Sequence, residues 1–265
     1  MARAAVLGRL TWRVATVSAV RDETATARTL VLDVPGWPGH EAGQHVDVRL
    51  TAPDGYTAVR SYSIASVAAE PGAPTAGPGA SADTVTGGEQ IEITVEQVED
   101  GEVSTYLAGV AGAGDQLEVR GPIGGWFAWR ATQSEPVQLI GGGSGVVPLM
   151  AMVRARAAAA SPAPFRLLYS TRRPQSVIYR SELERRAADG LPLTLVYTRA
   201  VPPGWSRPPG RVDAALLASA TFPPSEMPTC YVCGPTPFVE AVADQLLSAG
   251  HDPGRVRTER FGGLS

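Results

Sequence analysis

The order of strand-like and helix-like segments changes once along this chain, and that change limits the folds open to it. From residue 10 to about 121 the sequence carries β-type segments and one short helical stretch. From about residue 136 onward, strand-like segments alternate with helical ones. A run of strands predicts an antiparallel sheet or barrel, whereas alternation predicts a parallel sheet with helices on its faces. The 265 residues are enough for both.

Six segments in the first half have the residue types and the alternation that favour strands. They are residues 10–20, 28–34, 44–50, 60–66, 90–98 and 115–121. Alternation is clearest in the fifth segment, where polar residues separate Ile91, Ile93 and Val95. A short helix is expected at 103–110. Six strands joined by turns predict a closed barrel.

Residues 67–89 lie between the fourth and fifth predicted strands. They are rich in Ala, Gly and Pro and contain no aromatic residue. A segment of this composition buries too little surface to order itself. We interpret it as a mobile hairpin tip, with a binding lid as the alternative.

The second half repeats a strand followed by a helix. Three helix-end signals support the assignment: Pro148 in a first turn, Ser181 with Glu184 as a capping box, and Gly250 after the last helix. The repeat predicts a five-stranded parallel α/β domain. We place the domain boundary in residues 131–136, between domains at 10–131 and 134–263. The strands are expected at 136–142, 164–170, 191–199, 230–234 and 255–261, and the helices at 148–160, 181–188, 212–219 and 237–250.

Charge and basic residues exclude several classes of function. A net charge of −3 gives no general attraction to nucleic acid or to an anionic membrane. All 23 basic residues are arginine, which excludes a Schiff-base lysine and a P-loop lysine but supplies planar groups suited to phosphate. His40, His45 and His251 lack the spacing of metal ligands, so we interpret them as structural or surface residues and expect no metal.

The two cysteines, Cys230 and Cys233, lie in one predicted strand. Residues three apart on a strand point to opposite faces, so we do not expect a disulfide between them. Two cysteines are too few for a four-cysteine iron–sulfur cluster. With no apolar run of about 18 residues and no signal-peptide pattern, the sequence favours a cytoplasmic protein with no membrane contact.

The segment "GGGSGVVP" (141–148) follows a predicted strand and opens a predicted helix. Glycines allow the backbone to approach a diphosphate, and the helix N-terminus offers free N–H groups and positive potential. The pattern departs from G-x-G-x-x-G because its third glycine is replaced, and an ordinary tight turn is the alternative. The strand–turn–helix context favours a nucleotide site.

The ends of the next two strands indicate which nucleotide would bind. Folds that prefer NAD usually carry Asp or Glu at the end of the first of these strands, to bind the ribose 2′-hydroxyl. Here that strand ends with Thr171, Arg172 and Arg173, and the following strand with Thr198 and Arg199. Guanidinium groups suit a 2′-phosphate, so NADP(H) is favoured over NAD(H). The alternative is that these arginines are solvated strand ends.

The fourth strand begins "RSYSIAS" (60–66) and places a cation beside a phenol. Arg60 and Tyr62 are two apart on a strand and share a face, while Ser61 and Ser63 share the other. An arginine that holds phosphate and a ring that stacks suit a large, planar, anionic cofactor. An exposed Arg–Tyr pair on a barrel strand is the alternative.

These segments together resemble the ferredoxin–NADP⁺ reductase family. "RSYS" (60–63) is similar to its flavin motif and "GEVS" (101–104) to its second phosphate motif. Further matches follow in the family's order, so that the resemblance covers about residues 10–263; they are "GPIGGWF" (121–127), "GGGSGVVPLM" (141–150), "CGPTPF" (233–238) and "ERF" (259–261). It implies a six-stranded antiparallel Greek-key FAD-binding barrel followed by a pyridine-nucleotide α/β domain. The plant members' terminal tyrosine is absent, since this chain runs "ERFGGLS", so the part played by Phe261 near the ring stays open.

The resemblance implies a role for each matched residue. Arg60 would hold the FAD diphosphate, Tyr62 would stack on the isoalloxazine, and Ser63 would lie near its N5. Ser63 and Cys233 would position the reactants, and Glu259 would either exchange protons there or be a solvated acid. The remaining residues implied to bind FAD or nucleotide are Ser61, Thr94, Val95, Glu96, Gln97, Gly101, Glu102, Val103, Ser104, Gly142, Gly143, Ser144, Gly145, Thr171, Arg172, Thr198, Arg199, Arg211, Gly234, Pro235 and Phe261.

The implied activity is that of an NAD(P)H-dependent FAD reductase. Hydride would pass from NADPH to FAD, and electrons would then pass singly to a separate acceptor such as a ferredoxin, a flavodoxin, an oxygenase or a molybdoenzyme. A ferric-siderophore or small-molecule reductase without a protein acceptor is one alternative. A nucleotide-sensing subunit with no enzymatic activity is the other.

Overall fold

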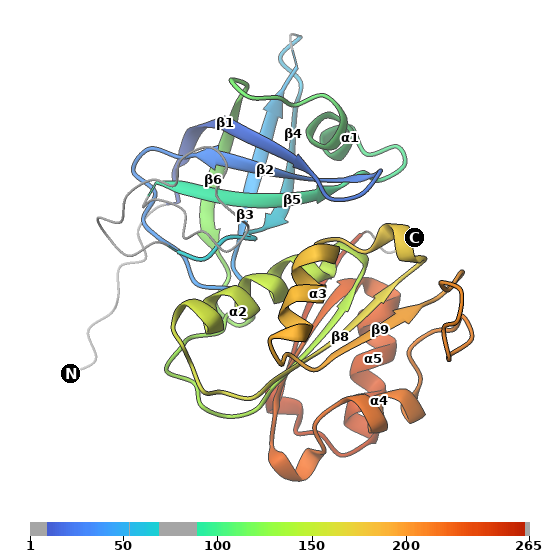
Figure 1. The fold of residues 1–265 in the computed structure, drawn as a ribbon. Helices are drawn as coiled ribbons and strands as arrows, with labels where there is room; N and C mark the ends of the chain where they lie inside the picture. Colours follow the sequence, from blue (N-terminus) through green and yellow to red (C-terminus); the bar gives the residue numbers. More distant parts are fainter. Residues whose placement is uncertain (1–9, 53, 69–88, 263–265) are drawn as a thin grey trace, which may run out of the picture.

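The computed structural model describes residues 10–52, 54–68 and 89–262. Two lobes are visible in Figure 1: a sheet-rich lobe built from the first half of the chain, and an α/β lobe built from the second half. The predicted hairpin tip at 67–89 lies almost entirely outside the described residues.

The first lobe is a six-stranded antiparallel sheet in the order β4-β3-β6-β1-β2-β5. Its terminal strands, β4 and β5, meet at a bridge between Ile64 and Ile93, which closes the sheet into a barrel at that end. The bridge lies just past the end of β4, and residues 57–63 of β4 form no ladder with β5, which leaves an opening between these two strands. The strands are β1 (Trp12–Asp22), β2 (Ala27–Asp33), β3 (His45–Thr51), β4 (Thr57–Ser63), β5 (Gln90–Glu96) and β6 (Gln116–Ile123).

Alternating apolar residues of these strands fill the barrel. Helix α1 (Glu102–Gly109) covers one end of it and adds Val103 and Leu107 to the core. The strand and helix predictions are therefore confirmed, with bounds displaced by a few residues.

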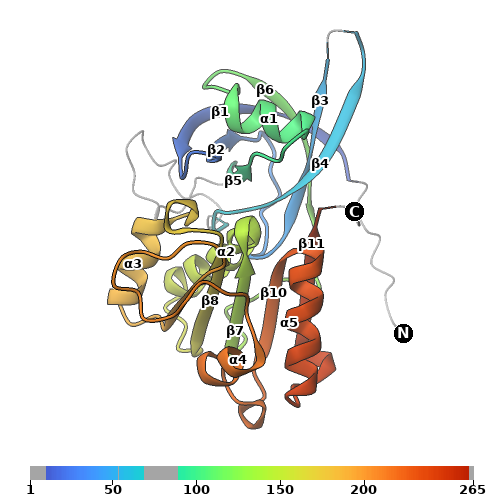
Figure 2. The same ribbon diagram turned by 90° about the vertical axis from the view of Figure 1, so that its right-hand side faces the viewer.

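The second lobe is a five-stranded parallel sheet in the order β11-β10-β7-β8-β9. Helices α2 and α3 pack on one face, and helices α4 and α5 on the other (Figure 2). The strands are β7 (Val137–Gly142), β8 (Phe165–Thr171), β9 (Leu193–Tyr197), β10 (Thr229–Pro235) and β11 (Val256–Phe261). The helices are α2 (Val146–Ala158), α3 (Arg180–Ala188), α4 (Ala214–Ala220) and α5 (Thr236–Ser248), with short 3-10 turns η1 (Gly143–Gly145), η2 (Pro174–Ser176), η3 (Pro224–Glu226) and η4 (Pro253–Arg255).

The two cysteines lie on opposite faces of the sheet, as the sequence predicts. Cys233 packs in the cluster on the α2 side of the sheet, and Cys230 in the cluster on the α4–α5 side. Both thiols are free. Helix α5 also ends as predicted, because Gly250 and His251 return hydrogen bonds to Leu247 and Leu246 in a Schellman motif.

The predicted capping box of α3 is wrong. The residue before the helix is Tyr179, at φ +59°, and no side chain caps the helix. Ser181 and Glu184 both lie within α3. The tyrosine is buried, and its hydroxyl contacts Thr94 on β5, so a contact between the lobes fixes where the helix begins.

A buried arginine of the second lobe is paired with a glutamate of the same lobe and also contacts the first lobe. Arg154 of α2 donates to Glu182 of α3 at 2.5 Å and to the carbonyl of Ala65 in the first lobe at 2.7 Å. Its guanidinium lies 4.6 Å from the centre of the Tyr179 ring and 3.9 Å from a carboxylate oxygen of Glu92 on β5. The Arg154 and Glu182 side chains are each 3% exposed, so this contact is enclosed on all sides.

Apolar residues from both halves form one further cluster. Ala27, Ala42, Ala65, Phe127 and Trp129 from the first half pack with the buried face of α2. The connection from β6 to β7 contains the boundary expected at 131–136, and the division into 10–131 and 134–263 stays a prediction. In the part of the chain that the structure describes, no helix is both long and apolar enough to cross a membrane.

Candidate functional site

The glycine-rich turn lies where the sheet of the second lobe meets the barrel. It follows β7, passes through η1 and starts α2, and no side chain caps the helix. Gly143 has φ +56°, a conformation that favours glycine. A Cβ on Gly145 would lie 2.2 Å from the carbonyl oxygen of Cys233, so only glycine allows α2 to begin this close to β10. The predicted strand–turn–helix is present, and the first-turn N–H groups of α2 point where an anion is favoured.

The three residues proposed for the reaction, Ser63, Cys233 and Glu259, lie on β4, β10 and β11 and are connected through neighbouring strands. Cys233 on β10 is in register with Glu259 on β11. A carboxylate oxygen of Glu259 lies 3.3 Å from Nδ1 of His45, and His45 pairs with Ser63 across β3 and β4. The carboxyl ends of the parallel strands therefore meet the end of β4 that carries Ser63.

His45 is the member of this group that the sequence analysis missed. Its contact with Glu259 depends on β3 and β11 meeting, and no local pattern around residue 45 reports that. Glu259 is not a fully solvated acid: its side chain is 24% exposed, and its second oxygen is buried without a hydrogen-bond partner among the described residues. This geometry suits a group that holds or moves a proton.

Burial controls the chemistry of the two thiols. Desolvation, reinforced by the charge of Glu259, raises the pKa of Cys233 well above its ordinary value. Burial raises the pKa of Cys230 to about 12. Neither thiol is ionised near neutral pH, so Cys233 suits a packing and positioning role rather than nucleophilic attack.

Strand β4 presents Arg60 and Tyr62 on one face, as predicted. Tyr62 is half-buried and packs against the barrel core, and burial raises its pKa to about 12 despite the nearby charge of Arg60. Arg60 is exposed; it donates to the carbonyl of its neighbour Val59, and no carboxylate partner is found among the described residues. Its guanidinium is available to an anion.

Ser61 points to the other face of β4. Its hydroxyl donates to Asp47 at 2.7 Å, and Asp47 in turn accepts from Arg120 at 2.5 Å. Burial raises the pKa of Asp47, but the hydrogen bonds from Arg120 and Ser61 outweigh it, and the net shift is downward. The Ser61 side chain is thus bound to this pair and not to the face that carries Arg60.

The opposite edge of the opening is β5. The hydroxyl of Thr94 is buried between Thr29 and Tyr179, so this side chain serves the contact between the lobes. Val95 is in the barrel core, and the N–H of Gln97 bonds to Thr26. A contact of this stretch with a cofactor through its backbone edge stays a prediction.

The start of α1 is a second helix end without a side-chain cap. Gly101 is its N-cap residue and no side chain caps the helix, so the first-turn N–H groups are available. The hydroxyl of Ser104 is engaged internally with Val98 and Gly101. The carboxylate of Glu102 accepts a hydrogen bond from Tyr56, and does not close the helix end.

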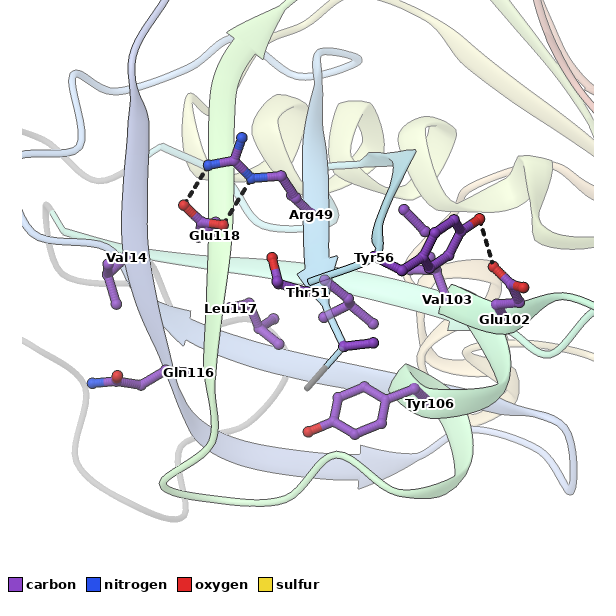
Figure 3. Close-up of a pocket in the computed structure, with 13 residues that line it drawn as sticks. Val14, Arg49, Thr51, Tyr56, Glu102, Val103, Tyr106, Gln116, Leu117 and Glu118 are labelled. Atoms are coloured by element: carbon purple, nitrogen blue, oxygen red, sulfur yellow. Dashed lines mark hydrogen bonds and ion pairs between the residues drawn. The ribbon is translucent and has the colours of Figure 1, made fainter. Parts of the chain in front are cut away.

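A cavity of about 630 Å³ opens beside this turn (Figure 3). Its apolar floor includes Ala58, two residues before Arg60 on the same face of β4. Tyr56 and Tyr106 flank it, and the Arg49–Glu118 ion pair lies on the far wall. The cavity therefore continues the face of β4 that carries Arg60 and Tyr62.

The predicted nucleotide-selecting residues also gather at one edge. The N–H groups of Thr198 and Arg199 bond to the carbonyls of Thr171 and Arg172, so the ends of β8 and β9 stay paired. Gly210, beside Arg211, bonds back to the end of β9. Arg172, Arg199 and Arg211 are exposed, and none has an ion-pair partner in the described ranges.

The fit of FAD to the first lobe can be judged from these features. An unpartnered guanidinium, an uncapped helix start, a half-buried phenol on the same face and an adjoining cavity are what a dinucleotide with a planar ring requires. The residues present fit the cofactor. The described residues contain no cluster of three His, Cys, Asp or Glu side chains suited to a metal.

Comparison with known proteins agrees with this geometry. Residues 139–244 match the oxidoreductase NAD-binding domain. The ferredoxin reductase component of 3-ketosteroid-9-alpha-monooxygenase from Rhodococcus rhodochrous is 29% identical over 94% of this chain and 65% of its own length. The chain spans 62% to 65% of the length of this and the next curated relatives it matches.

Solved structures share the fold over nearly the whole chain. The FAD/NAD-binding domain of nitric oxide dioxygenase from Vibrio cholerae superimposes with a TM-score of 0.77 at 24% identity, covering 95% of this chain and 99% of that one. A ferredoxin NADP⁺ reductase from Neisseria gonorrhoeae, with bound FAD and NADP, gives 0.74 at 19% identity, covering 94% and 98%. In sequence and in fold the chain therefore resembles the ferredoxin–NADP⁺ reductase-like family of FAD- and NAD(P)-binding reductases, and residues 139–244 match an oxidoreductase NAD-binding domain.

Proposed function

We propose that this chain takes electrons from NAD(P)H through FAD and passes them to a separate one-electron acceptor protein. The main support for the proposal is that two groups of residues, one from each lobe, face each other. The uncapped turn of α2, with Cys233 and Glu259, faces the β4 end that carries Tyr62 and Ser63. FAD, when bound, supplies the conversion between two-electron and one-electron transfer.

In this proposal the chain's residues position and hold the reactants. Arg60 and the first turn of α1 bind the FAD diphosphate, and Tyr62 packs against the ring. The cavity beside Tyr56 receives the adenosine half, because it continues the same face of β4. Ser63 and Cys233 exclude water and set the approach of the nicotinamide, while Glu259 with His45 holds or moves a proton at the edge of the site.

An absorption spectrum of the purified protein tests the core of the proposal. With added FAD the protein should show a flavin spectrum that bleaches on anaerobic addition of NADPH or NADH. A protein that stays colourless after incubation with FAD contradicts it.

Replacement of Tyr56 by Ala tests the assignment of the cavity. The variant should bind FAD more weakly and bind FMN unchanged, since FMN lacks the adenosine half. An equal loss of affinity for both flavins contradicts the assignment.

We further propose NADPH as the preferred nucleotide. The support is the group of exposed arginines, Arg172, Arg199 and Arg211, with no carboxylate among the residues that end β8 and β9. Replacement of Arg199 by Ala should raise KM for NADPH and leave KM for NADH unchanged. Equal effects on both nucleotides contradict the assignment.

The acceptor is proposed from the relatives. The Rhodococcus relative is named as the ferredoxin reductase component of a monooxygenase, which supports a protein acceptor here. Turnover should occur with a ferredoxin, a flavodoxin or an oxygenase component and be slow with ferric chelates. Fast reduction of ferric chelates without a protein acceptor would indicate the small-molecule reductase instead.

A further inference from the structure

Glu96, the last residue of β5, extends its side chain from the barrel to the glycine-rich turn of the second lobe. Its Oε2 accepts a hydrogen bond from the backbone N–H of Ser144 at 3.2 Å. A Cβ on Gly143 would lie 3.5 Å from the same oxygen. Within the described ranges the Glu96 side chain forms no ion pair with an arginine or histidine, and its hydrogen bond is the one to this turn.

The position of this carboxylate is that of a ligand anion. Free N–H groups and positive potential at a helix N-terminus stabilise a negative group, and α2 has no side-chain cap of its own. The sequence motif assigns these same N–H groups to the nucleotide diphosphate. A second anion brought to the turn would meet both an occupied donor and a like charge.

We propose that Glu96 is an intramolecular competitor of the nucleotide, whose carboxylate the diphosphate of NAD(P)H must displace from the Ser144 N–H in order to bind. The inference rests on the proposed function of this turn and goes beyond it, because it sets the affinity of the site. It assigns the side chain of Glu96 a task separate from the backbone contact with FAD that the family resemblance implies.

Calorimetric titration of the FAD-loaded protein with ADP-ribose, which carries the diphosphate, tests the competition. Glu96→Gln keeps the shape and an acceptor oxygen but removes the charge, and should lower the Kd for ADP-ribose about threefold to tenfold, the range expected when a helix-terminus charge effect is removed and the hydrogen bond is weakened. Glu96→Ala removes the contact altogether and should act in the same direction. Adenosine 2′-phosphate, which lacks the diphosphate, should bind all these proteins equally.

Glu99→Gln is the matched control. Glu99 is exposed, lies three residues after Glu96 and makes no contact with the turn, so its removal changes net charge by the same amount. It should leave the Kd for ADP-ribose unchanged. An equal gain in Glu99→Gln would overturn the proposal, because it would show a general charge effect.

Two negative results can be told apart. Unchanged or weaker ADP-ribose binding in both Glu96 variants, with normal binding by the wild-type protein, overturns this inference and leaves the proposed function standing. Failure of the wild-type protein and the variants to bind any of NADPH, NADH or ADP-ribose overturns the proposed function, and this inference with it.

Discussion

Replacement of Arg154 by Met should be among the most destabilising single changes in the protein. Arg154 and Glu182 are each 3% exposed, and Arg154 donates hydrogen bonds to the carboxylate of Glu182 at 2.5 to 3.2 Å. The methionine has a similar reach but no charge, so Glu182 would stay buried without its main counter-ion. The carbonyl of Ala65 would also lose its donor at 2.7 Å.

The expected loss of stability follows from the interactions that Arg154 makes with Glu182 and its neighbours. Breaking a buried pair from one side costs about 3–5 kcal/mol, because a charge is left uncompensated. Arg186 lies 3.5 Å from Glu182 and offsets a fraction of that cost. We expect a free energy of unfolding lower by about 4 kcal/mol, and a melting temperature lower by roughly 8–16 °C for a chain of this size.

Urea unfolding followed by tryptophan fluorescence and circular dichroism would measure the effect. The double variant Arg154→Met with Glu182→Gln removes both charges, and should recover more than half of the lost stability. A loss below about 1 kcal/mol for Arg154→Met, or no recovery in the double variant, would show that the pair is solvated or replaceable and would refute the reasoning.

Three further changes follow from the site. Arg60→Ala should raise the FAD Kd about 10-fold to 150-fold, the effect of losing a charge-assisted contact, as measured by fluorescence of released FAD; unchanged affinity contradicts the role of Arg60. Gly145→Ala should lower stability to urea by about 1–3 kcal/mol because its Cβ meets backbone, whereas Gly109→Ala, which meets nothing within 4 Å, should not. Burial raises the pKa of Cys230 to about 12 and that of Cys233 well above normal, so the unfolded chain alone loses these protons above about pH 9. Stability should therefore fall as pH rises from about 9 toward 12, and a disulfide reagent at pH 8 should label the thiols in urea but not in the native protein; fast native labelling contradicts this.

Local periodicity was sufficient to predict the strands, the helices and the two sheets. The spacing of Cys230 and Cys233 alone predicts that they lie on opposite faces, as they do, because side chains on a strand alternate strictly. The glycine-rich turn is predictable for a similar reason, since its backbone conformation and its close approach to β10 require glycine.

Contacts between the lobes were not predictable in this way. The start of α3 follows the burial of Tyr179 against Thr94 and not the Ser181–Glu184 signal, so tertiary packing overrode a local capping pattern. The approach of His45 to Glu259 and the reach of Glu96 to Ser144 both join segments with no shared sequence pattern. Each of these contacts depends on how the sheets of the two lobes lie relative to each other, and no local pattern in the sequence reports that.

The apolar cluster under α2 has a consequence for chimeric and truncated proteins. Because Phe127 and Trp129 are buried against residues of the opposite half, a fragment that stops near residue 131 would expose two large aromatic rings to water. A fragment that starts near 134 would expose the inner side of α2. Neither half should be soluble by itself. Recombination between relatives should succeed only where the residues on both sides of this apolar cluster come from the same parent protein.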